Sequence, residues 1–497
     1  MRLPHKAEIS APLRWKRTKG LSKARYALAT KHGVPTAESQ PEVSSRELVQ
    51  RILILLSFDY HIADSSKGDT RPMAQGPILI FDKSTLESLN ADEAVWLDNF
   101  FSTNITPLFF IETLADLEKQ VRGGRTPEQV VGNLSYKTPD MQSSPNVHHQ
   151  RLLEAELYGL ETIPMDGRPI ISGGSPVTLN GKTGIIFRRS KEEEALIRWQ
   201  AHEFLALERL IAKSWRRSLS DVNYEKAYKF FQNWFPSGTK PRSLQQVKVL
   251  ADDNIDGRDQ GKTLEFGMIL LGIPREARNQ ITARWQRAGE PAIRGFAPYF
   301  RYVLSVELFF YLAIASDLIS RDRPTNKVDL AYLYYLPFCM VFSSGDNLHE
   351  RTVPLFLRGD QTFVRGPDLK ADLSELDQHY SCLPQEVRDR GLFHFAACPP
   401  TDPSFLVSRL WDKHLPTLRK QQEEARKPLD ENLQRTLLDL VKRVEDGSSL
   451  VDPMTRVNTD NAAYVQIQRR VYFKKGKWNR FPPEVQREQQ DRAPGSR

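Results

Sequence analysis

The sequence predicts an α/β protein with a parallel sheet, because short apolar runs alternate with helix-like segments and several runs end at an acidic residue. Asp82 follows the run 77–81, Glu112 follows a second run, and Asp346 lies just beyond the run 338–342. Short apolar runs bounded by turn signals are typical of buried strands, and the carboxyl ends of parallel strands open onto a shared crevice. We therefore expect these acidic side chains to gather at one edge of the sheet.

The composition is that of a folded protein with room for two to four domains. The chain has 497 residues, of which 40% are hydrophobic and 27% are charged. Its net charge of +8 suits an anionic partner, or serves solubility alone. Three cysteines are too few for a disulfide framework or a zinc site, and neither a secretory signal nor an uncharged span of about 20 apolar residues is visible. We therefore expect a cytoplasmic protein that does not enter a membrane.

Residues 1–75 are expected to form a basic N-terminal arm and a helical extension. Residues 1–32 hold nine Lys or Arg against one acid, and Trp15 lies among the basic residues. This composition fits a phosphate-binding arm that stacks a base, a solvated tail, or an organelle transit peptide. The apolar segment 48–56 predicts a helix that packs on the neighbouring sheet.

Residues 76–125 predict a strand, a helix, a second strand and a second helix. Asp82 ends the first strand and can cap the helix that follows. Pro107 is expected to introduce the second strand over 108–111, with the second helix over 112–120.

The segment 126–321 predicts short hairpins followed by helices. Asn180-Gly181 lies between apolar residues, which is a strong signal for a hairpin over 178–187. Apolar residues at helical spacing then predict helices, at 191–215, 224–235, 275–288 and 298–320.

The segment 322–365 predicts a helix, a strand and a loop that bring two further acids together. Asn326 can cap a helix whose first turn holds Asp329, where a negative charge suits the helix dipole. Pro337 is expected to stop this helix before the strand 338–342. The first turn of a helix and the end of the next strand can face one crevice, so Asp329 can approach the acid after the strand.

Carboxylates gathered in this way would repel one another. At about 4 Å and an effective dielectric of about 20, two of them cost roughly 4 kcal/mol. A divalent cation removes this cost, so Asp82, Glu112, Asp329 and Asp346 are candidate metal-binding and catalytic residues. The alternative is that all four are helix caps and first-turn charges.

The four motifs ILIFDKS, FFIETLADLE, KVDLAYL and FSSGD resemble those of the PIN-domain nucleases. That family has an Asp after the first strand, a Glu on an early helix, and two Asp residues that bracket a late helix–strand unit. The resemblance implies a three-layer α/β/α sandwich with a parallel sheet, with a catalytic core over 76–125 and 322–365 and a mainly helical insertion at 126–321. It also implies Mg²⁺ or Mn²⁺ and hydrolysis of RNA rather than DNA by metal-activated water, and by analogy a role in stress response or defence.

Three further residues are possible accessory members of this site. Asp116 lies four residues after Glu112 on the same helix face, and could equally be an exposed helix charge. Ser344 could hydrogen-bond a carboxylate or a phosphate, or be an ordinary loop hydroxyl. His349 could contact phosphate or move a proton, or be an ordinary loop histidine.

Residues 366–497 predict a mixed α/β region with a charged helix over 428–446 and a tail in which basic and aromatic residues alternate. Basic residues beside aromatic ones suit phosphate contact with base stacking. The candidate nucleic-acid-binding residues are Arg469, Arg470, Lys474, Lys475, Lys477 and Trp478. A short hairpin with solvated lysines and core aromatics explains the same pattern.

Three functions follow from these observations. The first is a metal-dependent endonuclease that acts on RNA, and the second is a non-catalytic nucleic-acid-binding or scaffold protein that keeps the same fold. The third is a helical interaction protein without a nucleic-acid role, in which the acids only cap helices.

Overall fold

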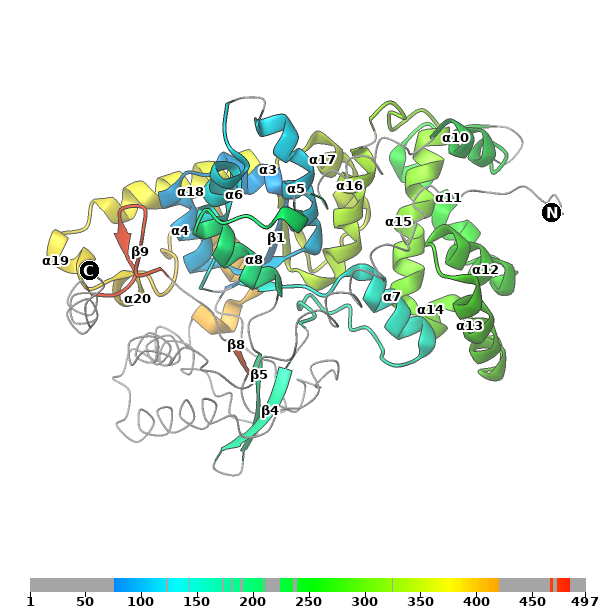
Figure 1. Cartoon of the computed structure of the whole chain (residues 1–497), viewed down its shortest axis with the longest axis horizontal. Coiled ribbons are helices and arrows are strands. Elements are labelled where there is room, and N and C mark those ends of the chain that lie inside the picture. Colours follow the sequence, from blue (N-terminus) through cyan, green and yellow to red (C-terminus); the bar gives the residue numbers. More distant parts are fainter. Residues whose placement is uncertain are drawn as a thin grey trace. The chain divides into compact units, whose positions relative to one another are not determined.

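The computed structural model describes residues 76–419, 465–467 and 472–482, apart from 122–123, 142, 172–173, 180–181, 188–190, 209, 211–223, 236–238 and 324. The described residues form two compact units, one that carries the sheet and one made of helices within 218–324 (Figure 1). The expectations for 1–75 and 428–446, and for Arg469 and Arg470, lie outside the described residues.

A five-stranded parallel sheet forms the centre of the first unit, as the sequence predicts. Its strand order is β3-β2-β1-β6-β7. The strands are β1 (Ile78–Phe81), β2 (Ser102–Ile105), β3 (Ser143–Pro145), β6 (Val341–Ser344) and β7 (Thr362–Arg365). Every residue of β1 and β6 is buried, as expected for central parallel strands that are covered on both faces. The arrangement is compatible with a three-layer α/β/α fold.

The strand order places a topological switch point between β1 and β6. The chain leaves β1 toward β2 and β3, and it leaves β6 in the opposite direction toward β7. In open parallel sheets, ligands bind in the crevice at the carboxyl ends of the strands where the order reverses. The residues that follow β1 and β6 therefore occupy the place where this fold class holds a ligand.

Helices of the sheet unit cover the strands and close a large apolar core. Helix α18 packs on α3, α4, β6 and β7, and η3 packs on β1. The helices are α3 (Lys83–Ser88), α4 (Ala91–Phe100), α5 (Pro107–Val121), α6 (Pro127–Lys137), α7 (His149–Tyr158), α8 (Lys191–Gln200), α16 (Asn326–Ala331), η3 (Tyr332–Phe338), α17 (Asn347–Thr352), η4 (Val353–Leu355), α18 (Gly366–Ser381), α19 (Gln385–Arg388), α20 (Leu392–Phe395) and α21 (Leu406–His414). The core includes Trp96 and Trp411, which are fully buried.

The predicted strand over 108–111 is wrong, because these residues form the first turns of α5. The second strand is β2, which comes earlier in the chain. Proline suits the first helical position, where its missing N–H would be unpaired, so Pro107 begins the helix instead of a strand. Periodicity alone does not separate a short apolar run in a buried helix from one in a buried strand.

The predicted helix over 327–336 is two elements. The α-helix α16 has Thr325 as its N-cap, so Asn326 is its first residue and not its cap. The chain then continues as the 3₁₀-helix η3, which contains Pro337, and the strand begins only at Val341. Pro337 has no N–H to donate in either kind of helix, and η3 ends one residue after it, at Phe338.

The sheet unit extends well beyond residue 125. It contains β3, α6, α7 and α8, and also the predicted hairpin, which the antiparallel strands β4 (Gly174–Leu179) and β5 (Lys182–Phe187) confirm. Strand β8 (Val465–Ile467) pairs with β5. A second hairpin, β9 (Lys474–Lys475) and β10 (Trp478–Asn479), packs on α4.

The second unit is helical over 224–323, where the sequence predicts helices. Its elements are α10 (Tyr224–Gln232), α11 (Leu244–Ile255), α12 (Gln260–Leu270), α13 (Arg275–Arg287), α14 (Ile293–Phe296) and α15 (Pro298–Ala315). Among the described helices, α15 alone has the length and apolar composition to cross a membrane, and most of it is buried. Helices α10, α11, α12 and α14 pack on it, which makes it the core of this unit.

Candidate functional site

The candidate site lies at the switch point of the sheet. Asp82 directly follows β1, and its backbone N–H donates to the carbonyl of Ser343 on β6 at 3.1 Å. Ser344 ends β6, and Gly345 and Asp346 form the loop after it. The parallel pairing of β1 with β6 thus brings two segments together that are about 260 residues apart in the chain.

Asp82 is buried and its two carboxylate oxygens are fully engaged. Both accept from the Ser84 hydroxyl, at 2.9 and 2.8 Å. The first oxygen also accepts from the Thr85 N–H at 2.8 Å, and the second from the Ser344 hydroxyl at 2.6 Å. Asp82 is therefore the N-cap of α3 and also a member of the site.

His349 on α17 connects three of the four predicted segments. Its Nδ1 lies 2.7 Å from Ser344 Oγ and 3.7 Å from Asp82 Oδ2, and its Nε2 lies 2.6 Å from the carbonyl oxygen of Asp329. Burial alone would lower its pKa, but Asp82 and Asp329 raise the pKa of His349 to about 9. The protonated ring can donate from both nitrogens, which suits these two oxygen partners.

The same contacts act on Asp82 in the opposite sense. Burial alone would raise its pKa, but His349, Ser344 and the Thr85 N–H hold the pKa of Asp82 below its ordinary value. The possible accessory residues Ser344 and His349 therefore both contact the first predicted acid.

Glu112 projects from α5, and the hydroxyl of Tyr332 donates to its Oε2 at 2.7 Å. Burial raises the pKa of Glu112 to about 8, and the nearby carboxylates of Asp82 and Asp329 add to this rise. Tyr332 and Lys83 lower this pKa but do not outweigh burial. The Glu112 carboxyl therefore holds a proton near neutral pH.

Asp329 lies in the first turn of α16, and its carboxylate has neither a hydrogen bond nor an ion pair within the described part of the chain. Burial raises its pKa to about 7. His349 opposes this rise, whereas Asp346, Asp82 and Asp116 increase it. This electrostatic coupling shows that the acids lie close enough to affect one another's protonation.

Asp346 caps the helix α17. Its Oδ1 accepts from the Leu348 N–H at 2.5 Å, and its own N–H donates to Ser344 Oγ at 3.0 Å. The Ser344 hydroxyl thus contacts Asp82, His349 and Asp346. The last residue of β6 therefore joins the Asp82 carboxylate, which is 262 residues away in the chain, to the His349 ring and to the backbone of Asp346.

Two residues that the sequence analysis did not identify also belong to the site. Lys83 is buried, and its ammonium group pairs with Asp116 at 2.7 Å and with Glu87 at 3.0 Å. Tyr332 lies three residues after Asp329, a spacing that puts both on one helix face and could have identified it. Asp116 is half-buried beside Lys83, so it is not a solvated helix charge.

The donor atoms of the site are those that a hard divalent cation prefers, since carboxylate oxygen is its usual ligand. Asp329, one oxygen of Glu112 and one oxygen of Asp346 accept no hydrogen bond from the described residues. In this arrangement, however, no three His, Cys, Asp or Glu side chains of the described residues are gathered to hold one ion. The chemistry of the donors fits a metal, and their present positions are not those of a formed metal site.

The candidate nucleic-acid-binding tail is folded into the sheet unit at two of its positions. Lys475 is fully buried and donates to the carbonyl of Thr138 at 2.9 Å. Trp478 is buried against Trp96, with ring centroids 4.8 Å apart, and its Nε1 donates to Asp377. Both side chains are buried and therefore unavailable to a nucleic acid, which corrects that expectation. The reason is that the hairpin packs on the sheet unit and buries the Trp478 ring in its core. Lys474 and Lys477 are exposed, and Lys477 pairs with Asp377 at 2.5 Å.

A buried charge cluster fastens this hairpin to the sheet unit. Arg480 donates to Asp98 at 2.6 Å and to both oxygens of Asp140 at 2.6 and 2.8 Å. Lys475 lies 3.3 Å from Asp140. Burial raises the pKa of Asp98 to about 6, although Arg480 opposes the rise, whereas Arg480 and Lys475 hold the pKa of Asp140 low despite its burial.

Comparison of the chain with protein-family models, with curated proteins and with solved structures gives no match.

Proposed function

We propose that this protein is a metal-dependent nuclease that hydrolyses RNA phosphodiesters at the switch point of its sheet. The observation that carries the proposal is that Asp82, Glu112, Asp329 and Asp346 lie close enough to influence one another's pKa values beside the carboxyl ends of β1 and β6, where this fold class binds ligands. Two of these carboxyls have raised pKa values, and such perturbed groups gather at functional sites more often than elsewhere.

The positions of the acids support a PIN-like core. An Asp follows the first strand, a Glu lies on the early helix α5, and Asp329 and Asp346 bracket the unit formed by α16, η3 and β6. This is the order of acids in the family that the sequence resembles. The proposed role in stress response or in defence against foreign nucleic acid rests on that resemblance, and the proposed cytoplasmic location rests on the composition of the sequence.

Glu112, Asp329 and Asp346 would hold Mg²⁺ or Mn²⁺, since each has a carboxylate oxygen without a hydrogen bond from the described residues. The ion would supply Lewis-acid chemistry, which neutralises charge on the phosphodiester and activates water for attack on phosphorus. Asp82 has both oxygens engaged, so we assign it the task of positioning Ser344 and His349. His349, with a pKa of about 9, provides a positive charge beside the site at neutral pH.

Asp346→Asn and Asp329→Asn are each expected to lower Mn²⁺-dependent cleavage by about a hundredfold or more. Loss of one ligand removes a few kcal/mol of transition-state stabilisation, and each 1.36 kcal/mol is about tenfold in rate. The measurement is cleavage of labelled single- and double-stranded RNA and DNA, with Mn²⁺, with Mg²⁺ and with EDTA. RNA should be cut faster than DNA, and EDTA should abolish cleavage.

Glu154→Gln is the matched control, because Glu154 is an exposed carboxylate on α7 of the same unit. This variant should cleave like the wild type. Cleavage that persists in EDTA, or that survives both aspartate substitutions, would refute the proposal.

A non-catalytic nucleic-acid-binding protein is the second candidate, and a specific observation favours it. Asp82 is saturated by hydroxyl and backbone donors, and no three candidate ligands among the described residues surround one point. This candidate predicts salt-sensitive binding of RNA without cleavage under any metal condition. The same cleavage experiment, run beside a binding measurement, separates the two.

A further inference from the structure

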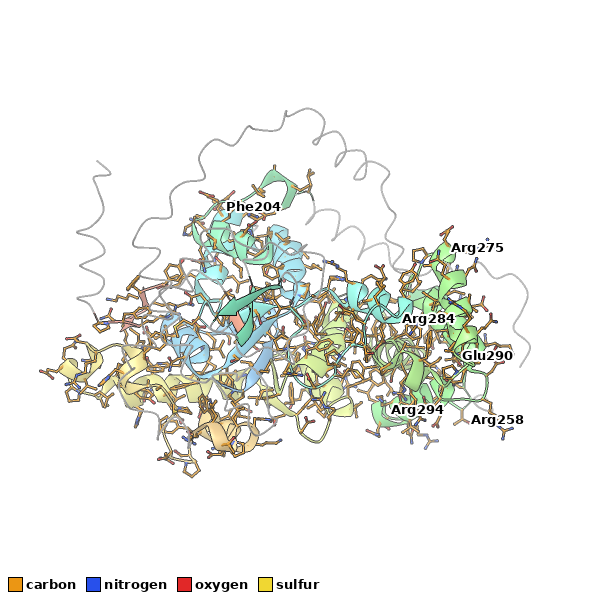
Figure 2. All side chains as sticks on the ribbon, turned by 90° about the horizontal axis from the view of Figure 1, so that it is seen from below. Phe204, Arg258, Arg275, Arg284, Glu290 and Arg294 are labelled. Atoms are coloured by element: carbon orange, nitrogen blue, oxygen red, sulfur yellow. The ribbon has the colours of Figure 1, made fainter. Side chains whose placement is uncertain are left out.

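Three exposed arginines of the helical unit come from different segments and lie around one junction. Arg258 precedes α12, Arg287 ends α13, and Arg294 lies on α14. A fourth, Arg284, lies over the ring of Phe296 with its guanidinium carbon 4.3 Å from the ring centroid. We call Arg258, Arg287 and Arg294 the arginine cluster. Figure 2 labels Arg258, Arg284 and Arg294 on this unit.

Specific contacts hold the three segments together. The N–H of Ile293 donates to Oε1 of Gln260 at 2.8 Å, which joins α14 to the start of α12. The indole N–H of Trp285 donates to the carbonyl of Pro291 at 2.8 Å, and a Cβ on Gly261 would lie 3.3 Å from the Trp285 ring. Each arginine of the cluster lies within two residues of one of these contacts, so the packing of α12, α13 and α14 brings the three segments that carry them together.

Two acids near the cluster are engaged by other cations, whereas the exposed Glu290, three residues after Arg287 (Figure 2), makes no ion pair with a described residue. Asp256 accepts from Arg301 at 2.7 and 3.3 Å, so Arg294 reaches it only at 3.7 Å. Asp259 pairs with Lys262. Arg258 and Arg287 are exposed and make no ion pair with any residue that the structure describes, although Nε of Arg287 donates to the carbonyl of Ala283 at 3.3 Å.

Helix electrostatics explain only part of this arrangement. A cation in the last turn of a helix is favourable, which accounts for Arg284 and Arg287 at the end of α13. Arg258 lies instead before the start of α12, where the helix dipole disfavours a positive charge. A concentration of positive charge that local stability does not explain suits an anionic partner.

We propose that the arginine cluster binds consecutive phosphates of a single-stranded nucleic-acid backbone. Guanidinium groups bind phosphate oxygens in pairs of hydrogen bonds, and they keep their charge at any physiological pH. This inference deepens the proposed nuclease function and rests on it, since that function makes nucleic acid the expected polyanion. The helical unit would then contribute to the affinity of the protein for RNA.

The test measures RNA binding by the full-length chain with cleavage disabled. Asp346→Asn protein in EDTA is titrated against a fluorescently labelled single-stranded RNA at salt concentrations between about 50 and 200 mM. Adding Arg258→Gln, Arg287→Gln and Arg294→Gln together should weaken binding by about tenfold to a hundredfold. It should also reduce the slope of log affinity against log salt by about 2, because each single-strand phosphate contact contributes about 0.7.

Arg275→Gln is the matched control, because Arg275 is an exposed arginine at the other end of α13, about 18 Å along the helix from Arg287. This variant should change the slope far less than the triple variant does. An unchanged affinity and slope in a triple variant whose circular dichroism equals that of the parent would overturn the proposal. So would loss of binding to anionic lipid vesicles without any loss of RNA binding.

The two proposals fail in different ways. If wild-type protein cleaves RNA while the triple variant binds as tightly as its parent, the arginine assignment alone is wrong. If no metal supports cleavage while RNA binding still depends on the three arginines, the nuclease proposal alone is wrong.

Discussion

Arg480→Met is expected to lower the free energy of unfolding of the sheet unit by about 3–5 kcal/mol, which is the usual effect of removing one partner from a buried ion pair. Arg480 is fully buried and holds Asp98 and Asp140 with three hydrogen bonds. Without the guanidinium, the two buried carboxylates lose these three hydrogen bonds, while Lys475 and backbone N–H donors remain among their partners. Methionine fills much of the same space, so the loss is electrostatic and not a cavity.

Urea unfolding followed by tryptophan fluorescence measures this effect, since Trp478 on the hairpin packs on Trp96 of α4. Lys474→Met is the control, because Lys474 is an exposed cation on the same hairpin and its substitution should change stability by no more than about 0.5 kcal/mol. An Arg480→Met protein as stable as this control would show that the charge cluster does not fasten the hairpin. The additional change Asp98→Asn should recover part of the loss by removing one uncompensated charge.

Glu112→Gln is expected to stabilise the metal-free protein by up to roughly 4 kcal/mol near pH 8, since one unit of pKa shift corresponds to about 1.36 kcal/mol. Burial raises the pKa of Glu112 to about 8 from its ordinary value of 4.5. The folded state therefore binds this proton more tightly than the unfolded state, and the stability of the wild type falls as the pH rises from about 4.5 to about 8. Glutamine stays neutral and can still accept from the Tyr332 hydroxyl.

The measurement is urea unfolding in EDTA at a series of pH values between these limits. The variant should show a smaller loss of stability with rising pH than the wild type, and Asp329→Asn should behave in the same direction because burial raises that pKa to about 7. Glu154→Gln, which removes an exposed charge, should follow the wild type. Equal pH dependence in wild type and Glu112→Gln would show that folding does not raise the pKa of this carboxyl.

The positions of three of the four candidate acids in the fold were predictable because each follows from a local pattern. Asp82 and Asp346 lie beside short apolar runs that form β1 and β6, and Asp329 lies in the first turn of a predicted helix. Their partners were not predictable to the same degree. The roles of Ser344 and His349 depend on the pairing of β1 with β6, and a contact across that distance in the chain leaves no local periodicity.

The basic-aromatic tail shows the opposite case, in which a local pattern allowed two interpretations. Lys475 and Trp478 carry the same residue types whether they face a nucleic acid or the core, and the pattern of charges and rings does not distinguish the two. Lys475 is directed to the interior by the buried carboxylates of Asp140 and Asp98, and Trp478 by packing against Trp96. These partners lie more than 300 residues away in the sequence.

The sequence by itself determined the class of fold, the central strands β1 and β6 and several helices, because apolar periodicity and turn chemistry act over a few residues. It misplaced the strand before Glu112, since a short apolar run after Pro107 suits a buried helix and a buried strand equally. Only the tertiary structure decided the strand order, the switch point and the contacts of His349, Lys83 and Arg480. These features depend on which distant segments of the chain pack against one another. The burial that results then shifts the pKa values of the buried groups and so decides which of them are charged.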